Sequence, residues 1–199
     1  MSHAGRNVRL VLLDTNVVSE LRTKRPRPEV LRWVDANRGR VAISIVTVQE
    51  IQAGAELARP GAPEAAARIE AWLDGIVAAG LPLPGAVPEP VQIISPGPLA
   101  ARLVGRMQEH PALRDFARTH PGQKRPTNSG DLWLAAIAVE RGAPVATRDV
   151  GDFSRIHAVV PLPGLYDPWS GRWLVTPAAD PPEPIGGTEE DQAGTPPPP

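Results

Sequence analysis

The chain has 199 residues, of which 42% are hydrophobic and 22% are charged, so it is long enough for one folded domain with a substantial core. It has no cysteine, which excludes a disulfide framework and a thiolate metal site and favours the cytoplasm. Residues 1–176 contain all 21 basic side chains and 17 of the 22 acidic ones, so this region has a mild net positive charge. Such a charge permits a nucleic-acid partner without requiring one.

The first half of the chain predicts strands that alternate with helices. An apolar strand over residues 9–13 is too short for a signal sequence or a membrane span, so we expect no membrane association. Residues 17–34 read as helical with a break at Pro26 and Pro28. A β-branched strand follows over 41–46. Further helices are predicted from Thr47 to about Leu57, and from about Glu64 to Ala79.

The third strand is predicted to be short and to follow a proline-rich connection. This connection covers residues 81–90, the strand covers 91–94, and a helix with apolar residues at positions 99, 103 and 107 covers 99–109. Residues 110–127 are polar and interrupted by three prolines. They predict an excursion over the surface.

The second half contains the most apolar helix of the chain. From Asp131 to Val139 it is apolar on every side, which indicates a helix in the middle of the domain, and Gly142 suits its end. Short strands are predicted over 145–147 and 159–162. The order favours a single α/β domain over residues 1–176, with a mainly parallel sheet of about four or five strands flanked by helices. The proline-rich, acidic composition of 177–199 predicts a disordered tail.

Four acids stand at the edges of apolar elements, and together they suggest a metal site. They are Asp14, Glu50, Asp131 and Asp149. Burying several carboxylates near one sheet edge is costly unless a cation neutralises them. Ligands that are all oxygen point to Mg²⁺ or Mn²⁺.

Each acid taken alone also has a simpler structural explanation. Glu50 completes a capping box with Thr47, and Asp131 in the first turn of a helix is favoured by the helix dipole. Asp149 could be a turn residue, and Asp152 could cap the turn before Phe153. The four histidines have no metal-binding spacing, and the basic clusters are typical of solvated faces.

Several stretches of the chain, in their order and spacing, carry a specific resemblance. They are residues 12–21 with the continuation to Trp33, 43–51, 130–138, 146–153, and the later Asp167-Pro168-Trp169. Together they resemble PIN-domain ribonucleases, and within that family the VapC-type toxins of bacterial toxin-antitoxin pairs. The resemblance covers about residues 9 to 169.

The resemblance implies roles for individual residues. Asp14, Glu50, Asp131 and Asp149 match an acidic quartet that holds one or two divalent ions, and Asp152 matches an acid often found just beyond it. Asp14 and Asp131 are expected to hold the principal ion, Asp149 and Asp152 a second or water-mediated one, and Glu50 the attacking water. The polar residues Thr15, Asn16 and Thr147 match positions that orient the carboxylates. The chain departs from the pattern at Ser95-Pro96-Gly97, where an acid is common, and in its longer 110–127 segment.

The function that the resemblance implies is metal-dependent hydrolysis of RNA phosphodiester bonds by the toxin of a type II toxin-antitoxin pair. Its implied partners are RNA, a small antitoxin and a second copy of the chain. Two alternatives remain. One is a catalytically inactive PIN-like scaffold that binds RNA or protein. The other is a haloacid-dehalogenase-like phosphatase, which requires an acid and a threonine where this chain has Asn16 and Val18.

Overall fold

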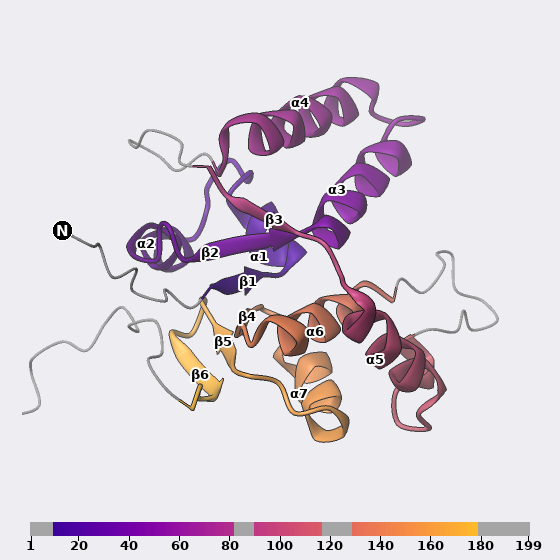
Figure 1. Ribbon diagram of the computed structural model, residues 1–199. Helices are drawn as coiled ribbons and strands as arrows, with labels where there is room; N and C mark the ends of the chain where they lie inside the picture. The colour runs from indigo at the N-terminus through magenta and orange to yellow at the C-terminus, as the bar shows by residue number, and fades with distance from the viewer. Residues whose placement is uncertain (1–9, 82–89, 117–128, 179–199) are drawn as a thin grey trace, which may run out of the picture.

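The computed structural model describes residues 10–81, 90–116 and 129–178, and most of the predicted surface excursion and tail lies outside these ranges. Within them the chain forms a six-stranded sheet in the order β3-β2-β1-β4-β5-β6 (Figure 1). The strands are β1 (Val11–Leu13), β2 (Val41–Ser44), β3 (Gln92–Ile94), β4 (Val145–Ala146), β5 (Leu165–Asp167) and β6 (Arg172–Val175). The first five strands run parallel and β6 is antiparallel to β5, which confirms the predicted α/β class.

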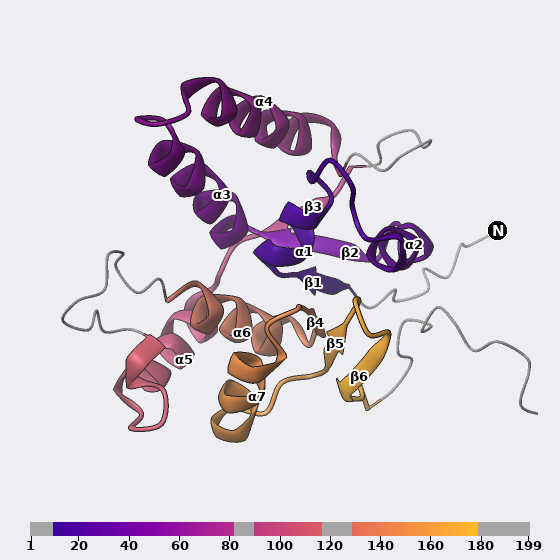
Figure 2. The same cartoon turned by 180° about the vertical axis from the view of Figure 1, so that it is seen from behind.

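Helices cover both faces of the sheet. They are α1 (Thr15–Glu20), α2 (Pro28–Ala36), α3 (Ile45–Ala58), α4 (Pro63–Ala79), α5 (Pro98–Glu109), α6 (Gly130–Arg141) and α7 (Val150–Val159), with a 3-10 turn η1 (Arg114–Phe116). Successive residues of β1 point to opposite faces: Leu12 packs with α5, α6 and α7, and Leu13 packs with α1 to α4. Figures 1 and 2 show the two sets of helices on either side. The central strand is therefore apolar throughout because both of its faces are buried.

The start of α3 differs from the prediction. Strand β2 ends at Ser44, whose hydroxyl accepts a hydrogen bond of 3.0 Å from the Thr47 amide and so caps the helix. Ile45 and Val46, predicted as strand, belong to the helix. The capping box between Thr47 and Glu50 is wrong, because the helix begins two residues earlier and Glu50 falls in its second turn.

The end of the domain also differs from the prediction. Residues 159–162 are not a strand: Val159 ends α7, which buries Phe153 and Ile156. The fifth strand is β5, and β6 adds a sixth at the edge. These strands are three and four residues long, too short for a periodic pattern to reveal them.

Helix α5 and the turn after it correct two further expectations. Leu99 is 49% exposed, and the buried face of α5 consists of Ala100, Val104 and Met107. Leu113 and Phe116 lie in the core, so the start of the expected surface excursion packs against the domain. Among the described residues, no helix has the length and apolarity needed to cross a membrane.

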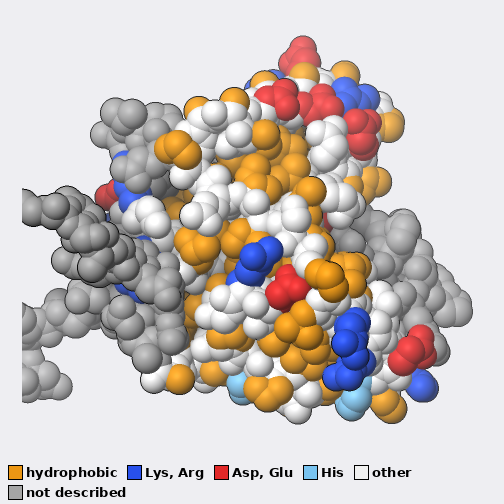
Figure 3. Space-filling view, in the orientation of Figure 1, with side chains coloured by type: hydrophobic (Ala, Val, Ile, Leu, Met, Phe, Trp, Pro, Cys, Tyr) orange, Lys and Arg blue, Asp and Glu red, His pale blue; other side chains and the backbone are white. Residues whose placement is uncertain are grey.

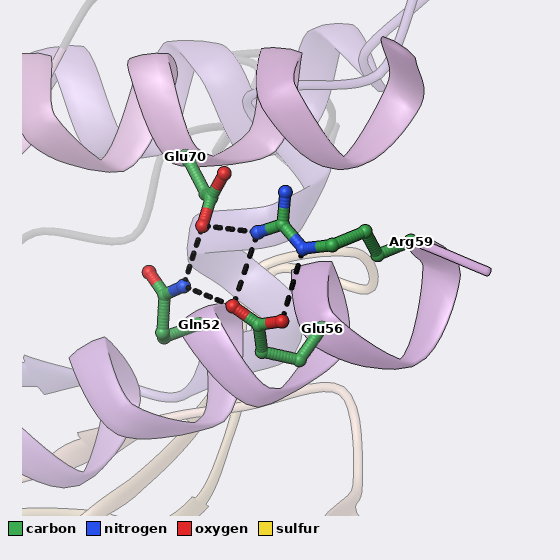
Figure 4. A network of polar contacts seen from close by, with 4 residues as sticks. All are labelled: Gln52, Glu56, Arg59 and Glu70. Atoms are coloured by element: carbon green, nitrogen blue, oxygen red, sulfur yellow. Dashed lines mark hydrogen bonds and ion pairs between the residues drawn. The ribbon is translucent and has the colours of Figure 1, made fainter. Parts of the chain in front are cut away.

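A polar network joins α3 to α4 (Figure 4). Arg59 pairs with Glu56 on its own helix at 3.0 Å and with Glu70 of α4 at 2.5 Å. Gln52 donates to Glu70 at 2.8 Å and to Glu56 at 3.2 Å. The network holds the outer parts of the two helices together, while the first turns of α3 lie at the sheet.

Candidate active site

Asp14 follows the central strand β1 and is held by three hydrogen bonds. It caps α1 and is only 5% exposed. Its Oδ1 accepts from the Thr15 amide at 2.6 Å, and its Oδ2 accepts from Asn16 Nδ2 at 2.5 Å and from the Thr147 hydroxyl at 2.6 Å. The first acid is therefore fixed in orientation at the carboxyl edge of the sheet.

Thr147 joins the ends of β1 and β4. These strands pair in parallel, and the Asp14 amide donates to the Ala146 carbonyl at 3.0 Å. The Thr147 hydroxyl also accepts from Asn16 Nδ2 at 3.1 Å and from the Asp149 amide at 2.8 Å. The buried Thr147 hydroxyl thus contacts the side chains of Asp14 and Asn16 and the backbone of Asp149. The resemblance implies that Thr147 orients the carboxylates, and this role stays a prediction.

Glu50 reaches the same edge from α3. The Thr15 hydroxyl donates a short hydrogen bond to Glu50 Oε2. Because the Thr15 amide also donates to Asp14, Thr15 contacts both Asp14 and Glu50.

Asp131 lies in the first turn of α6, and its pKa shows what surrounds it. Burial is the largest cause that raises the pKa of Asp131, and with the negative charges of Asp14, Glu50, Asp149 and Asp152 it brings the value to about 8. All five predicted acids therefore share one electrostatic neighbourhood.

The pKa of Asp14 reports the same balance. Burial raises it most, the hydrogen bonds from Thr147 and Thr15 lower it, and the charges of Glu50 and Asp149 raise it, so that the net pKa of Asp14 is about 6. Buried carboxylates with like charges disfavour one another's ionised forms, and a bound cation would favour those ionised forms.

The remaining acids lie further out. Asp149 precedes α7, is exposed, and makes no side-chain cap, so the helix does not account for its carboxylate. Asp152 pairs with Arg155 at 3.3 Å instead of capping the turn.

The donor chemistry suits a hard divalent cation, because carboxylate and hydroxyl oxygens are the groups present. Over the described ranges, however, no three or more His, Cys, Asp or Glu side chains are grouped closely enough to form a metal site. The ligand atoms are thus of the type that binds Mg²⁺ or Mn²⁺. In the described residues the carboxylates are too far apart for three or more of them to coordinate one ion together.

The sequence did not predict a cluster of aromatic side chains that joins α2, β5 and β6, or the contact of Arg148 with Trp169. Trp33 stacks on Tyr166 with ring centroids 4.8 Å apart, and Trp173 packs on the same ring at 4.9 Å. The Arg148 guanidinium lies 5.6 Å from the centre of the Trp169 ring. The sequence signals for this cluster are the stretch that continues to Trp33 and the Asp167-Pro168-Trp169 stretch, and neither predicts that the rings pack together.

Part of the chain matches a protein-family model, and two characterised proteins are similar to most of it. The PIN domain model matches residues 11–82. Toxin FitB of Neisseria gonorrhoeae is 29% identical over 163 residues, which cover 80% of this chain and 99% of FitB. Plasmid stability protein StbB of Pseudomonas syringae pv. tomato is 29% identical over 146 residues, which cover 72% of this chain and 91% of StbB.

Solved structures agree with this fold. The crystal structure of FitAcB from Neisseria gonorrhoeae matches with 28% identity and a TM-score of 0.52, over 80% of this chain and 99% of the other. DNA-bound VapBC from Salmonella typhimurium matches with a TM-score of 0.54 over 80% and 98% of the two chains. At 22% identity the second match bears on the fold alone.

Proposed function

We propose that this chain, a PIN-domain protein with relatives of the FitB and VapC type, is a divalent-metal-dependent endoribonuclease and the toxin of a type II toxin-antitoxin pair. The observation that carries the proposal is the hydrogen-bond network of Thr15 and Thr147, which holds the carboxylates of Asp14 and Glu50 at one edge of the sheet. In open α/β proteins, ligands bind at the carboxyl ends of the parallel strands, and the carboxylates lie at that edge of the sheet.

In this mechanism Asp14 and Asp131 would hold the principal Mg²⁺ or Mn²⁺, and Asp149 with Asp152 would serve a second or water-mediated position. When bound, the ion lowers the pKa of its water and offsets charge on the phosphoryl oxygens. Glu50, held by the Thr15 hydroxyl, accepts the proton of the attacking water. The water oxygen forms a bond to phosphorus in line with the P–O3′ bond that breaks, and the leaving 3′-oxygen takes a proton from solvent water, so the products are a 5′-phosphate and a 3′-hydroxyl.

The test is cleavage of labelled RNA by the purified chain with Mg²⁺ or Mn²⁺ and with EDTA. We expect cleavage that EDTA abolishes and that Asp14→Asn lacks, with the circular dichroism of the variant unchanged. Asp74→Asn, which removes an exposed carboxylate from α4, is the matched control and should cleave normally. Full activity of Asp14→Asn would remove the metal role.

The same assay separates the two alternatives. An inactive scaffold would bind RNA without cutting it under any metal condition. A phosphatase would need an acid at position 16, but Asn16 is committed to structure: its amide donates to Asp14 and Thr147, and its carbonyl oxygen accepts from the Arg148 amide at 3.1 Å.

The antitoxin partner is proposed from the similarity to toxin FitB. Expression of the chain alone should arrest bacterial growth, and co-expression of the small reading frame beside its gene should relieve the arrest. Arrest that persists with Asp14→Asn would separate toxicity from the acids.

A homodimer is part of the same proposal. Among the described residues strand β3 is an edge strand of the sheet, and Figure 3 shows hydrophobic side chains across the middle of the face on which it lies. Ile45, Ile93 and Leu99 are 47%, 38% and 49% exposed. Sedimentation of the wild type and of Ile93→Lys should give a dimer and a monomer respectively.

A further inference from the structure

Arg148 is an exposed residue in the turn between β4 and α7. It stands in sequence between Thr147, whose hydroxyl binds Asp14, and Asp149. The backbone amide of Arg148 donates to Asn16 Oδ1 at 3.1 Å, and Asn16 Nδ2 donates in turn to Asp14 Oδ2 at 2.5 Å. The backbone of Arg148 is therefore joined to the first acid through two hydrogen bonds.

The other end of the Arg148 side chain contacts an aromatic ring. Its guanidinium carbon lies 5.6 Å from the centre of the Trp169 ring, which is a cation–π contact. Strands β4 and β5 pair in parallel, so the turns that follow them lie side by side. Trp169 is half-buried, and its amide donates to Asp167 Oδ1 at 2.9 Å. The guanidinium thus lies against a ring that is itself held in place.

The guanidinium of Arg148 has no anionic partner in the part of the chain that the structure describes. It makes no hydrogen bond or ion pair there, although Asp149 follows it directly. Arg155 of α7 differs, because it pairs with Asp152 at 3.3 Å and with Asp115 at 2.8 Å. Of these two arginines, Arg148 is the one whose N–H groups remain for a ligand.

The contact with Trp169 prepares this guanidinium for an anion. The ring orders the side chain but supplies no acceptor oxygen, so the five N–H donors of the guanidinium are still unused. Their planar fork matches two oxygens of a phosphate group and binds them through charge-assisted hydrogen bonds. A side chain that is ordered beforehand loses less entropy when it binds.

The acids beside Arg148 make such a cation useful to an RNA strand. An RNA backbone is a chain of negative charges, and carboxylates repel it as it approaches. A guanidinium next to the carboxylates offsets part of that repulsion, and basic side chains supply most of the sequence-independent affinity for nucleic acids.

We propose that Arg148 binds a backbone phosphate of the RNA, next to the phosphate that is cut. The inference rests on the proposed ribonuclease function and adds a residue that positions its substrate. No acid lies within ion-pair distance of the guanidinium among the described residues. The phosphate that it binds is therefore a neighbour of the one among the carboxylates. Contacts to phosphate position a strand without reading its bases, so Arg148 sets where the strand lies and not which base is recognised.

The test is binding of a fluorescein-labelled oligouridine in EDTA, where the proposed cleavage does not occur, by fluorescence anisotropy over a range of salt concentrations. Arg148→Gln should weaken binding by about tenfold at low salt, as for loss of one charge-assisted pair. The slope of log affinity against log salt concentration should become shallower by about 0.7, the value for one phosphate contact of a single strand. Arg148→Lys retains the charge and the slope, but should bind less tightly than the wild type because it lacks the planar fork.

Arg68→Gln is the matched control, since it removes the same charge from α4, where the Arg68 side chain is 72% exposed. It should bind RNA like the wild type. Trp169→Leu should weaken binding and keep the salt slope, because the charge of Arg148 remains. Oligoadenosine should lose the same factor as oligouridine in Arg148→Gln, because the contact is to phosphate. Arg148 is exposed, so the circular dichroism of its variants should match that of the wild type.

Several results would overturn the proposal. One is an unchanged affinity and salt slope in Arg148→Gln, and another is an equal loss in Arg68→Gln, which would indicate an effect of net charge alone. A wild type that binds no oligouridine at low salt would also contradict it. If Arg148→Gln binds RNA normally but the small reading frame no longer relieves its growth arrest, Arg148 contacts the antitoxin and the proposal is wrong. A wild type that binds RNA through Arg148 but cuts none with Mn²⁺ would refute the nuclease and keep the phosphate contact.

Discussion

The hydroxyl of Thr147 donates a 2.6 Å hydrogen bond to Asp14 Oδ2, across 133 positions of sequence. It joins the end of β4 to the end of β1 and leaves Asp14 with one orientation. The geometry of the first acid thus depends on a residue from the last third of the chain.

Thr147→Val keeps the shape of this side chain and removes its hydroxyl. Asp14 then loses one of its three donors, so we expect metal affinity and kcat/KM to fall by about 10- to 100-fold, as for other residues that orient metal ligands. Metal titration and steady-state cleavage measure both quantities. Thr147→Ser retains the donor and should stay close to wild type; equal losses in the two variants would point to packing and not to the hydrogen bond.

Glu50 is predicted to act through its carboxylate and to be positioned by Thr15. Glu50→Gln should lower kcat by at least about 100-fold, the lower range for loss of a general base. Thr15→Val should lower kcat by less, with little change in KM, because it removes one hydrogen bond to the carboxylate and leaves the carboxylate in place. Single-turnover cleavage across a pH series tests both. A Glu50→Gln enzyme with the wild-type pH profile would exclude the base role.

The stability of the protein in EDTA should fall as pH rises. The pKa of Asp131 is about 8 in the fold and 3.8 at its ordinary value, so the folded state retains a proton that the unfolded state releases. The contribution of protonated Asp131 to the free energy of unfolding is complete below about pH 3.8, and it is lost as the pH rises towards 8. Between these limits the free energy of unfolding should drop by up to about 1.4 kcal/mol per pH unit from this group.

Asp131→Asn isolates that contribution. Denaturant unfolding of the two proteins between pH 5 and 8 should show the steeper decline in the wild type. Mn²⁺ at pH 8 should raise the stability of the wild type more than that of the variant, since a ligand stabilises the state that binds it. Parallel pH curves would show that Asp131 titrates normally.

The ends of cleaved RNA distinguish two kinds of chemistry. Attack by water predicts a 5′-phosphate and a 3′-hydroxyl, so the downstream fragment should ligate directly and the upstream fragment should accept poly(A) tailing. Attack by the RNA 2′-hydroxyl would leave a cyclic phosphate. A cyclic phosphate on the upstream fragment would rule out the mechanism described above.

The sequence predicts much of the fold because burial leaves a clear pattern in it. The apolar run before Asp14 and the apolar helix after Asp131 lie at the centre of the domain, where both faces are covered. Parallel strands gather their carboxyl ends at one edge, and for that reason acids far apart in sequence were expected together.

Other features left no such pattern. The capping of α3 by Ser44 depends on one hydroxyl, and the strands β5 and β6 are too short to show alternation. The stacking of Trp33 on Tyr166 arises from tertiary packing of α2 on β5, which no local stretch of sequence records. The roles of the acids and of the polar residues around them remain predictions until a metal is bound.

Diffraction from Mn²⁺-soaked crystals, collected where manganese scatters anomalously, tests the central claim most directly. We predict an anomalous peak in contact with the carboxylates of Asp14 and Asp131, which disappears in Asp14→Asn. Crystals that bind Mn²⁺ elsewhere, or that show no peak at these side chains at saturating concentration, would contradict a shared cation at this edge of the sheet.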